Sequence, residues 1–378
     1  MRVLILEDDP WIADLLKQIV LSLRPDARID CQVRVADALA AWQREPAQLV
    51  ISDWNLPDGP GTRLLEGIRQ TDRAVPLVMV TARSDRDSVL AVRKLGISAF
   101  ISKPFQVPKV LASLQALLAN GEAQVQAPGT AENFLEHLQA LSSDALDLPL
   151  RQALHRSLSS GEPRPTDLRQ LDEQWQNDPA VHARLIAAAN STAYNSASKP
   201  CISLSEALQR LGSATAFNLI QGLALRPVAT LQDDDLRQLG DEHWQHAQRL
   251  RKRIGELATA SRIDPAPLHS AALLQRMGEL AVLYEAQRWR AANQPLDETT
   301  LHSALQHHSS QLANRLKARW RLPTPLRELI GACYALPPGN TRRDPVVMRL
   351  ANAELQCAEP LELERLRRLA GMGAERLP

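Results

Sequence analysis

Leu49-Val50-Ile51-Ser52-Asp53-Trp54-Asn55-Leu56-Pro57 is the stretch that decides the fold. Its apolar residues 49–51 precede a turn-forming Leu-Pro-Asp-Gly at 56–59, so we predict a buried strand that ends at Asp53. In open α/β sheets, ligands bind beyond the carboxyl ends of the strands. A strand-ending Asp taken alone is most often a turn or capping residue. The interpretation of Asp53 therefore depends on the residues at the other strand ends.

Strands and helices alternate over the first 118 residues. Four more strands are predicted at about 3–6, 28–33, 77–80 and 99–102. The intervening helices are predicted at about 10–23, 36–44, 62–68, 85–95 and 107–118. Five strands alternating with helices predict a parallel sheet with helices on both faces.

The predicted strand ends carry a chemically coherent set of side chains: Glu7, Asp8, Asp53, Thr81 and Lys103. Close carboxylates repel one another unless a divalent cation lies among them, and oxygen ligands suit Mg²⁺. Such a cation neutralises an incoming phosphoryl group and leaves the Asp53 carboxylate to act as the nucleophile. Thr81 offers a hydroxyl and Lys103 an ammonium to the phosphate oxygens.

Residues 1 to about 119 resemble the receiver domain of bacterial two-component response regulators. The match rests on Leu-Glu-Asp-Asp at 6–9, Ser-Asp-Trp-Asn-Leu-Pro at 52–57, Val-Thr-Ala at 80–82 and Ser-Lys-Pro-Phe at 102–105. It implies a flavodoxin-like sheet with strand order 2-1-3-4-5. It also implies phosphorylation of Asp53 by a sensor histidine kinase or phosphotransfer protein. Mg²⁺ would then be held by Glu7, Asp8, Asp53 and the backbone carbonyl of Asn55.

Three expectations about the receiver stay open. Phe100 occupies the position of the family's switch aromatic, with plain core packing as the alternative. Arg83 follows Thr81 by two positions, and we hypothesise that its guanidinium reaches the acyl phosphate and slows its hydrolysis. A homodimer formed through the receiver is a further alternative.

A polar stretch with Gly121, Pro128 and Gly129 predicts a linker at 120–130, between a receiver at 1–119 and a helical region at 131–378. In that region, Asp178-Pro179 predicts a helix start, and Ser203 with Glu206 forms a capping box before a helix that runs to Gly212. Residues from about 140 to 340 resemble the HDOD domain, an all-helical signalling module related to HD-type metal phosphohydrolases.

The metal ligands of those hydrolases are missing at the matching positions. HD enzymes need a His, an adjacent His-Asp pair and a further Asp to hold metal and activate water. His246 matches the first His, but Gln275 and Arg276 replace the pair. The remaining candidates, His302, His307 and His308, lack carboxylate partners at ligand spacing. We therefore expect no enzyme activity and no cofactor in the helical domain, with a cryptic metal phosphohydrolase as an alternative.

Two basic clusters raise the alternative of a DNA-binding transcriptional regulator: 249–253, and Arg315, Lys317, Arg319 and Arg321. Basic runs are usually solvated helix faces, and neither helix-turn-helix nor zinc-finger spacing accompanies them. Trp320 fits a packing role at a helix end. The net charge of +1 gives no overall attraction to nucleic acid or anionic membranes, so we expect neither as a partner.

Composition is typical of a soluble, cytoplasmic protein. The four cysteines lie far apart without paired spacing, which argues against a zinc site or disulfides and fits a reducing compartment. No signal peptide follows Met1, and no apolar run approaches membrane-spanning length. We predict a phosphorelay response regulator whose Asp53 state switches contacts between an inactive HDOD output and a downstream signalling protein.

Overall fold

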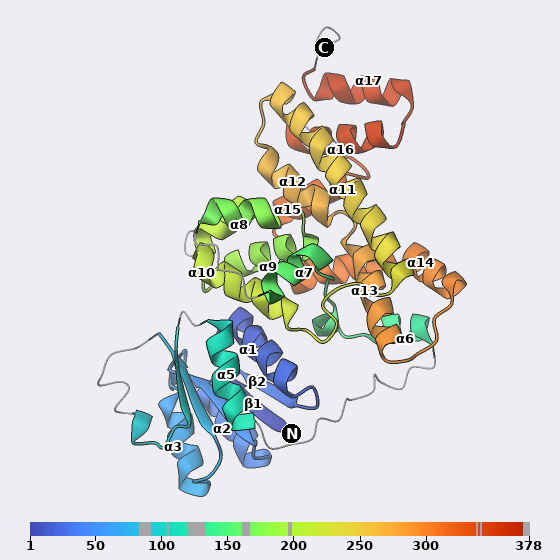
Figure 1. Ribbon diagram of the computed structural model, residues 1–378. Helices are drawn as coiled ribbons and strands as arrows, with labels where there is room; N and C mark the ends of the chain where they lie inside the picture. Colours follow the sequence, from blue (N-terminus) through green and yellow to red (C-terminus); the bar gives the residue numbers. More distant parts are fainter. Residues whose placement is uncertain are drawn as a thin grey trace. The chain divides into compact units, whose positions relative to one another are not determined.

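The computed structural model describes residues 1–82, 92–103, 106–118, 133–160, 167–195, 199–337, 339–340 and 342–372. Two compact units make up the chain (Figure 1): residues 1–127 with 217–227, and residues 128–216 with 228–378. The first contains a parallel sheet covered by helices, and the second is built of helices. Each unit is described by itself.

The first unit is centred on a five-stranded parallel sheet in the order β2-β1-β3-β6-β7. The strands are β1 (Arg2–Leu6), β2 (Arg28–Gln32), β3 (Leu49–Asp53), β6 (Leu77–Thr81) and β7 (Ala99–Ser102). Two-residue strands β4 (Asn55–Leu56) and β5 (Gly59–Pro60) form a separate antiparallel ribbon after β3. The predicted order 2-1-3-4-5 is confirmed, because the main strands follow that pattern once this ribbon is left out.

Alternating strand residues divide between two cores, as the period of a strand requires. Val3 and Ile5 face a core with helices α1 (Pro10–Leu23) and α5 (Val107–Leu118). Leu4 and Leu6 face a second core with α2 (Val35–Arg44) and α3 (Thr62–Thr71). Both faces of the sheet are therefore covered, which explains why its central strands are apolar without polar alternation.

Two predicted helix ends of the first unit can be compared with the structure. Asp9 caps α1, because its Oδ1 accepts hydrogen bonds from the amides of Trp11 at 2.8 Å and Ile12 at 3.4 Å. Gly96 has a φ of +67°, the left-handed conformation expected of a helix C-cap. Most of the helix predicted at 85–95 lies outside the described residues.

The remaining helices and one 3₁₀ turn follow in chain order. They are α6 (Phe134–Ala140), η1 (Ser143–Ala145), α7 (Gln152–Ser159), α8 (Leu168–Trp175), α9 (Pro179–Ala189), α10 (Leu204–Ala224), α11 (Asp234–Ser261), α12 (Pro265–Leu274), α13 (Met277–Ala291), α14 (Glu298–Arg319), α15 (Thr324–Ala332), α16 (Arg343–Leu355) and α17 (Pro360–Leu369). From residue 133 onward, the described residues contain one isolated β-bridge, between Leu150 and Thr230, and no named strand. The predicted all-helical character is confirmed.

Helix α9 starts where Asp178-Pro179 predicts, with Asp178 Oδ1 accepting from the amides of Ala180 at 3.0 Å and Val181 at 3.2 Å. Every residue of α9 is buried. A helix that is enclosed on all sides belongs to the centre of a domain rather than to its surface.

The capping box before α10 is present in altered form. Ser203 Oγ accepts from the Glu206 amide at 3.3 Å, but Glu206 Oε2 accepts from the amide of Ile202 at 3.0 Å rather than from that of Ser203. The helical conformation is interrupted at Gly212, whose φ is +73°, which agrees with the predicted helix end.

Among the described residues, none of the helices combines the length and the apolar character needed to cross a membrane. The four cysteines are free thiols, as predicted, with Cys201 and Cys333 buried and Cys31 and Cys357 exposed.

Candidate functional site

The carboxyl edge of the sheet brings together the acidic residues that the sequence places at strand ends. Glu7 and Asp8 follow β1 and Asp53 ends β3, and these strands are neighbours in the sheet. One carboxylate oxygen from each lies within 4.8 Å of the others. Glu7 is 1 % exposed and Asp53 is 7 % exposed, whereas Asp8 is exposed.

Lys103, directly after β7, is the cation of this edge. Its Nζ lies 2.7 Å from Glu7 Oε2, 2.9 Å from Glu7 Oε1 and 2.8 Å from Asp53 Oδ2. The other Asp53 oxygen, Oδ1, accepts from the amide of Trp54 at 2.5 Å. Thr81 is fully buried at the end of β6, and its carbonyl accepts from the Lys103 amide at 2.6 Å. The structure thus gathers the predicted residues around Asp53.

The charges at this edge are out of balance. Burial raises the pKa of Glu7 to about 8, in spite of the attraction of Lys103. Burial also raises the pKa of Asp8, and the Asp53 charge adds to that effect. Burial alone would lower the pKa of Lys103, but the charges of Glu7 and Asp53 outweigh it and raise that pKa. One ammonium therefore faces three carboxyl groups, and a hard divalent cation such as Mg²⁺ fits this oxygen donor set.

The loop after Asp53 depends on Gly61. A Cβ there would lie 1.8 Å from the carbonyl oxygen of Asp53, a distance that no side chain can occupy. The Gly61 amide donates to the Trp54 carbonyl at 2.8 Å, and Asn55 pairs with Pro60 across the ribbon. The ribbon thus fixes the backbone of Asn55, a predicted metal ligand, two residues after Asp53.

Asp58, at the tip of the ribbon, makes a long-range contact that our sequence reasoning missed. Its Oδ1 accepts from the amide of Val35 at 2.9 Å and its Oδ2 from the amide of Ala36 at 3.1 Å, and these bonds lower the pKa of Asp58. Asp58 therefore caps α2 from 22 residues further along the chain. Neither helix periodicity nor local capping rules signal such a distant cap.

Phe100 lies in the middle of β7, where it pairs with Met79 of β6. It is partly buried and packs against the core of α2 and α3, so this structure shows the packing contact that was the alternative to a switch. Arg83, the other residue with an open role, lies outside the described residues.

In the helical unit, Arg276, which the sequence led us to expect at the position of the HD pair, precedes α13. Its Nη1 is 3.0 Å from Nδ1 of His243, one helical turn before His246 on α11. Burial, followed by the charge of Arg276, lowers the pKa of His243 to about 4 and that of His246 to about 4. This group is electropositive, which opposes metal binding. Our sequence reasoning missed His243, although its spacing of three from His246 places both on one helix face.

The other histidines that the sequence singled out do not form a metal cluster. Nδ1 of His307 lies 2.9 Å from the Ser303 carbonyl of its own helix, and His302 is exposed. Across the described ranges, Glu7, Asp8 and Asp53 form the one group of three or more potential ligand side chains.

Two of the four cationic residues of the first basic cluster, Arg251 and Arg253, are engaged within the fold. Arg253 forms ion pairs with Glu354 and Glu256, both at 2.5 Å, and Leu250 is buried. Arg251 donates to Gln176, with its Nη1 2.8 Å from the Gln176 carbonyl. Arg249 and Lys252, by contrast, are exposed.

Two members of the second cluster are also held within the fold. Arg315 donates to the backbone carbonyls of Leu138 and Leu141, and burial lowers the pKa of Lys317. Trp320 is 4 % exposed and ends α14, which confirms its predicted packing role.

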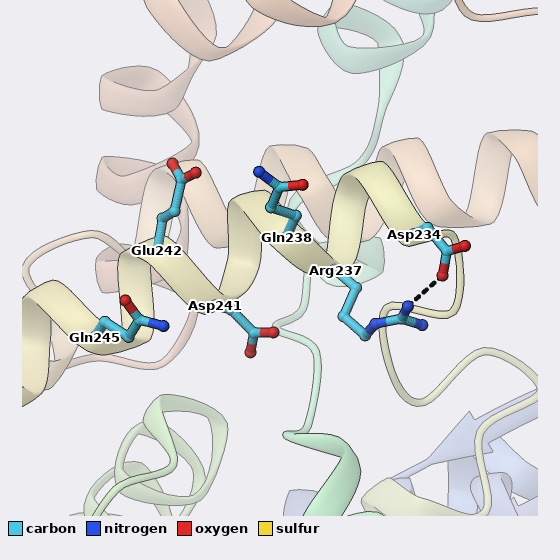
Figure 2. Close-up of a pocket in the computed structure, with 6 residues that line it drawn as sticks. All are labelled: Asp234, Arg237, Gln238, Asp241, Glu242 and Gln245. Carbon is cyan, nitrogen blue, oxygen red and sulfur yellow. Dashed lines mark hydrogen bonds and ion pairs between the residues drawn. The ribbon is translucent and has the colours of Figure 1, made fainter.

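A hollow of about 490 Å³ lies along the N-terminal half of α11, and Figure 2 shows the residues that line it. Its lining residues, which all belong to this one helix, are Asp234, Arg237, Gln238, Asp241, Glu242 and Gln245. The Arg237 guanidinium is paired with Asp234, one turn earlier. The other polar side chains extend from the helix surface without converging, so this hollow is not a candidate catalytic site.

Two family models match separate parts of the chain. The response regulator receiver domain matches residues 3–115, and the HDOD domain matches residues 149–336.

Individual relatives each match a part of the chain. Response regulator protein PilR of Pseudomonas aeruginosa is 33% identical over 125 residues, which are 32% of this chain and 28% of PilR. Sensory transduction protein RegX3 of Mycolicibacterium smegmatis is 30% identical over 164 residues, which are 40% of this chain and 68% of RegX3. The non-phosphorylated HemR receiver domain from Leptospira biflexa is 27% identical, with 32% of this chain and 98% of that domain covered at a TM-score of 0.30. The chain thus spans little more than a quarter of PilR.

Proposed function

Because this chain belongs to the response regulators and contains a receiver domain and an HDOD domain, we propose that Asp53 is its phosphoacceptor in a phosphorelay. A sensor histidine kinase or a phosphotransfer protein is the donor. The Asp53 carboxylate forms the new oxygen–phosphorus bond while the nitrogen–phosphorus bond of the donor's phosphohistidine breaks. The observation that carries this proposal is the contact of Lys103 Nζ with both Asp53 and Glu7.

Each residue of the edge has a distinct part in this proposal. Glu7, Asp8, Asp53 and the Asn55 carbonyl hold Mg²⁺, which supplies positive charge to the transferred phosphoryl group. Lys103 exchanges its carboxylate contacts for a phosphoryl oxygen, and the Thr81 hydroxyl donates to another. The raised pKa of Glu7 supports this assignment, since a carboxyl group that is costly to ionise in isolation gains most from a nearby cation.

The direct test is phosphorylation of the full chain by acetyl phosphate, followed by peptide mass spectrometry. The wild type should gain one Mg²⁺-dependent phosphoryl group on the peptide that contains Asp53, and Asp53→Asn should gain none. Asp58→Asn is the matched control, because it removes an acid from the same loop that caps α2 instead. Labelling of Asp53→Asn equal to that of the wild type would refute the proposal.

The second part of the proposal concerns the output. The HDOD unit acts through contacts with a downstream signalling protein and not through metal-dependent hydrolysis. The support is the Gln275-Arg276 replacement together with the proximity of Arg276 to His243, which puts a fixed positive charge among the candidate ligands. Phosphorylation would shift a two-state equilibrium of the receiver that changes how the helical unit is presented.

Hydrogen exchange of the full chain tests this coupling. Exchange in the helical unit should change when acetyl phosphate and Mg²⁺ are added to the wild type, and should stay constant in Asp53→Asn. Changes confined to the receiver would contradict a role of the helical unit as the output. Elemental analysis of the purified chain adds a second test, because stoichiometric transition metal retained by Asp53→Asn would point to a metal site in the helical unit.

A further inference from the structure

A hollow of about 310 Å³ in the helical unit has the character of an anion site. Its floor is one face of α11, with Gln248, Arg251, Lys252 and Gly255 at positions i, i+3, i+4 and i+7. Asn177 in the turn between α8 and α9, and His269 of α12, complete the lining. Three separate elements therefore converge on this hollow, in contrast to the single helix drawn in Figure 2.

Arg251 is held in place without being neutralised. Its guanidinium donates to the Gln176 carbonyl at 2.8 Å, to Gln176 Oε1 at 3.1 Å and to Asn177 Oδ1. Within the described ranges, no carboxylate lies within ion-pair distance of Arg251. The nearby charge of Asp172 favours its protonated form, but burial outweighs that charge and lowers the pKa of Arg251. Neutral partners thus orient the Arg251 guanidinium and leave it without an ion-pair partner.

Two nitrogen atoms of the lining residues lack a hydrogen-bond partner. Nε of Arg251 and Nε2 of His269 are buried, and neither has a hydrogen-bond partner among the described residues. Burial and the Arg251 charge lower the pKa of His269 to about 4, so its imidazole is neutral at pH 7. Its single N–H is used in a hydrogen bond to the backbone of Arg251, which leaves Nε2 as an acceptor. Lys252 is exposed beside them. Buried polar atoms without partners are uncommon, and both atoms belong to residues that line the hollow.

Gly255 keeps the hollow open. A Cβ at this position would lie 3.7 Å from His269 Nε2, an ordinary van der Waals distance. An alanine is therefore sterically tolerated at position 255, yet its methyl group would occupy the space next to the unpaired imidazole nitrogen.

We propose that this hollow binds the phosphate group of a small phosphorylated metabolite of about mononucleotide size. The lining contains two cationic side chains, an imidazole and two amides but no carboxylate, and Arg is well suited to bidentate contacts with phosphate. The volume lies at the lower end of the range for small-molecule sites, about 300–1,000 Å³, which matches a mononucleotide better than a larger ligand. This binding does not require phosphorylation of Asp53.

The test is calorimetric titration of the full chain without Mg²⁺, using AMP, GMP, inorganic phosphate and adenosine as probes. We expect a nucleotide to bind and adenosine not to bind. Lys252→Gln should weaken nucleotide binding about threefold, as loss of one exposed charge contact does. Gly255→Ala should weaken it about tenfold through the added methyl group. Because Gly→Ala within a helix usually stabilises the fold, unfolding cannot account for such a loss.

Two matched controls separate local from general effects. Arg249→Gln removes a positive charge from an exposed position of the same helix that does not line the hollow. Gly331→Ala adds a methyl group to a helical glycine with open space around it. Both should bind the probes as the wild type does.

The outcomes separate the sources of phosphate. Tighter binding of AMP or GMP than of inorganic phosphate supports a nucleotide ligand. Equal binding of inorganic phosphate supports the same phosphate site with the free anion as its ligand. Absence of binding by every probe would overturn the proposal, as would adenosine binding as tightly as AMP or binding that Lys252→Gln and Gly255→Ala leave unchanged.

Discussion

The Asp53 edge and the Arg276 group each place one cation beside titratable side chains, but the local charges are opposite. Lys103 contacts two carboxylates at 2.7–2.9 Å, and a third carboxyl group lies close by. Arg276 lies against His243, and the pKa values of His243 and His246 are lowered to about 4. The first group has an excess of negative charge that a divalent cation can relieve, whereas the second has a positive charge that repels one. This contrast supports a cation-binding edge in the receiver and a group in the helical unit that repels cations.

The largest expected effects come from replacing one glycine near each group, Gly61 near Asp53 and Gly278 near Arg276. Gly61→Ala would bring a Cβ within 1.8 Å of the Asp53 carbonyl, and Gly278→Ala would bring one within 2.0 Å of the Ser309 carbonyl on α14. Each backbone must move, so each change should lower the free energy of unfolding of its own unit by about 3 kcal/mol. Denaturant unfolding, with exchange resolved by unit, measures this loss.

The same pair separates function between the units. Gly61→Ala should also slow phosphorylation of Asp53, and Gly278→Ala should not. Gly331→Ala, with open space around its Cβ, is the control for both. If Gly61→Ala and Gly278→Ala slowed phosphorylation equally, the units could not be treated as chemically independent.

The second prediction removes the cation from the Asp53 edge. Lys103→Gln leaves Glu7 and Asp53 without their shared partner and removes one donor to the transferred phosphoryl group. Labelling by acetyl phosphate should slow by about 100-fold, as expected when one preorganised electrostatic contact to a transition state is lost. Lys94→Gln, an exposed lysine of the same unit, should react like the wild type. A rate for Lys103→Gln within a factor of about two would mean that Lys103 only neutralises the resting acids.

A third prediction concerns pH: the stability of the two units should change with pH in opposite directions. The folded pKa of His182 is lowered to about 3 by burial, from an ordinary value of 6.5. The unfolded state therefore binds the proton first, and stability of the helical unit is retained above pH 6.5 and lost as pH falls. At pH 5 a single buried histidine of this kind accounts for about 2 kcal/mol.

Glu7 has the reverse sign, because its folded pKa of about 8 lies above the ordinary value of 4.5. The folded receiver holds a proton that the unfolded chain has released, so without Mg²⁺ its stability falls as pH rises from 4.5 towards 8. Exchange measured by unit at pH 5, 6 and 7.5 tests both slopes. Glu7→Gln should flatten the receiver slope and His182→Asn should reduce the helical one; parallel slopes in the two units would contradict the charge contrast.

The smallest expected effect concerns Arg276 itself. Arg276→Gln removes the positive charge next to His243 and His246, so both pKa values should rise. They should stay below 6.5, because burial is the larger cause of the shift. Titration of the imidazole signals by NMR measures this, with Arg249→Lys as a charge-preserving control. Unchanged pKa values would show that Arg276 does not set the charge of this group.

The sequence was sufficient for most of the Asp53 edge, because strand ends are local features. Apolar runs that stop at Glu7, Asp53, Thr81 and Lys103 predict the strands, and parallel pairing places their ends together. The helix starts at Asp9 and Asp178 were predictable for the same reason, since an N-cap involves only the next three residues. The full burial of α9 was not, because its residues do not show how many neighbours surround the helix.

Only the tertiary structure decided contacts between residues far apart in the chain. Asp58 caps α2 across more than twenty residues, and Arg276 meets His243 across 33. Arg251 contacts Gln176 across 75 residues, and it lies with Lys252 of the same basic cluster on the floor of a defined hollow. Local periodicity and capping depend on neighbours within about one helical turn, whereas the environment of a charge depends on whichever elements pack beside it.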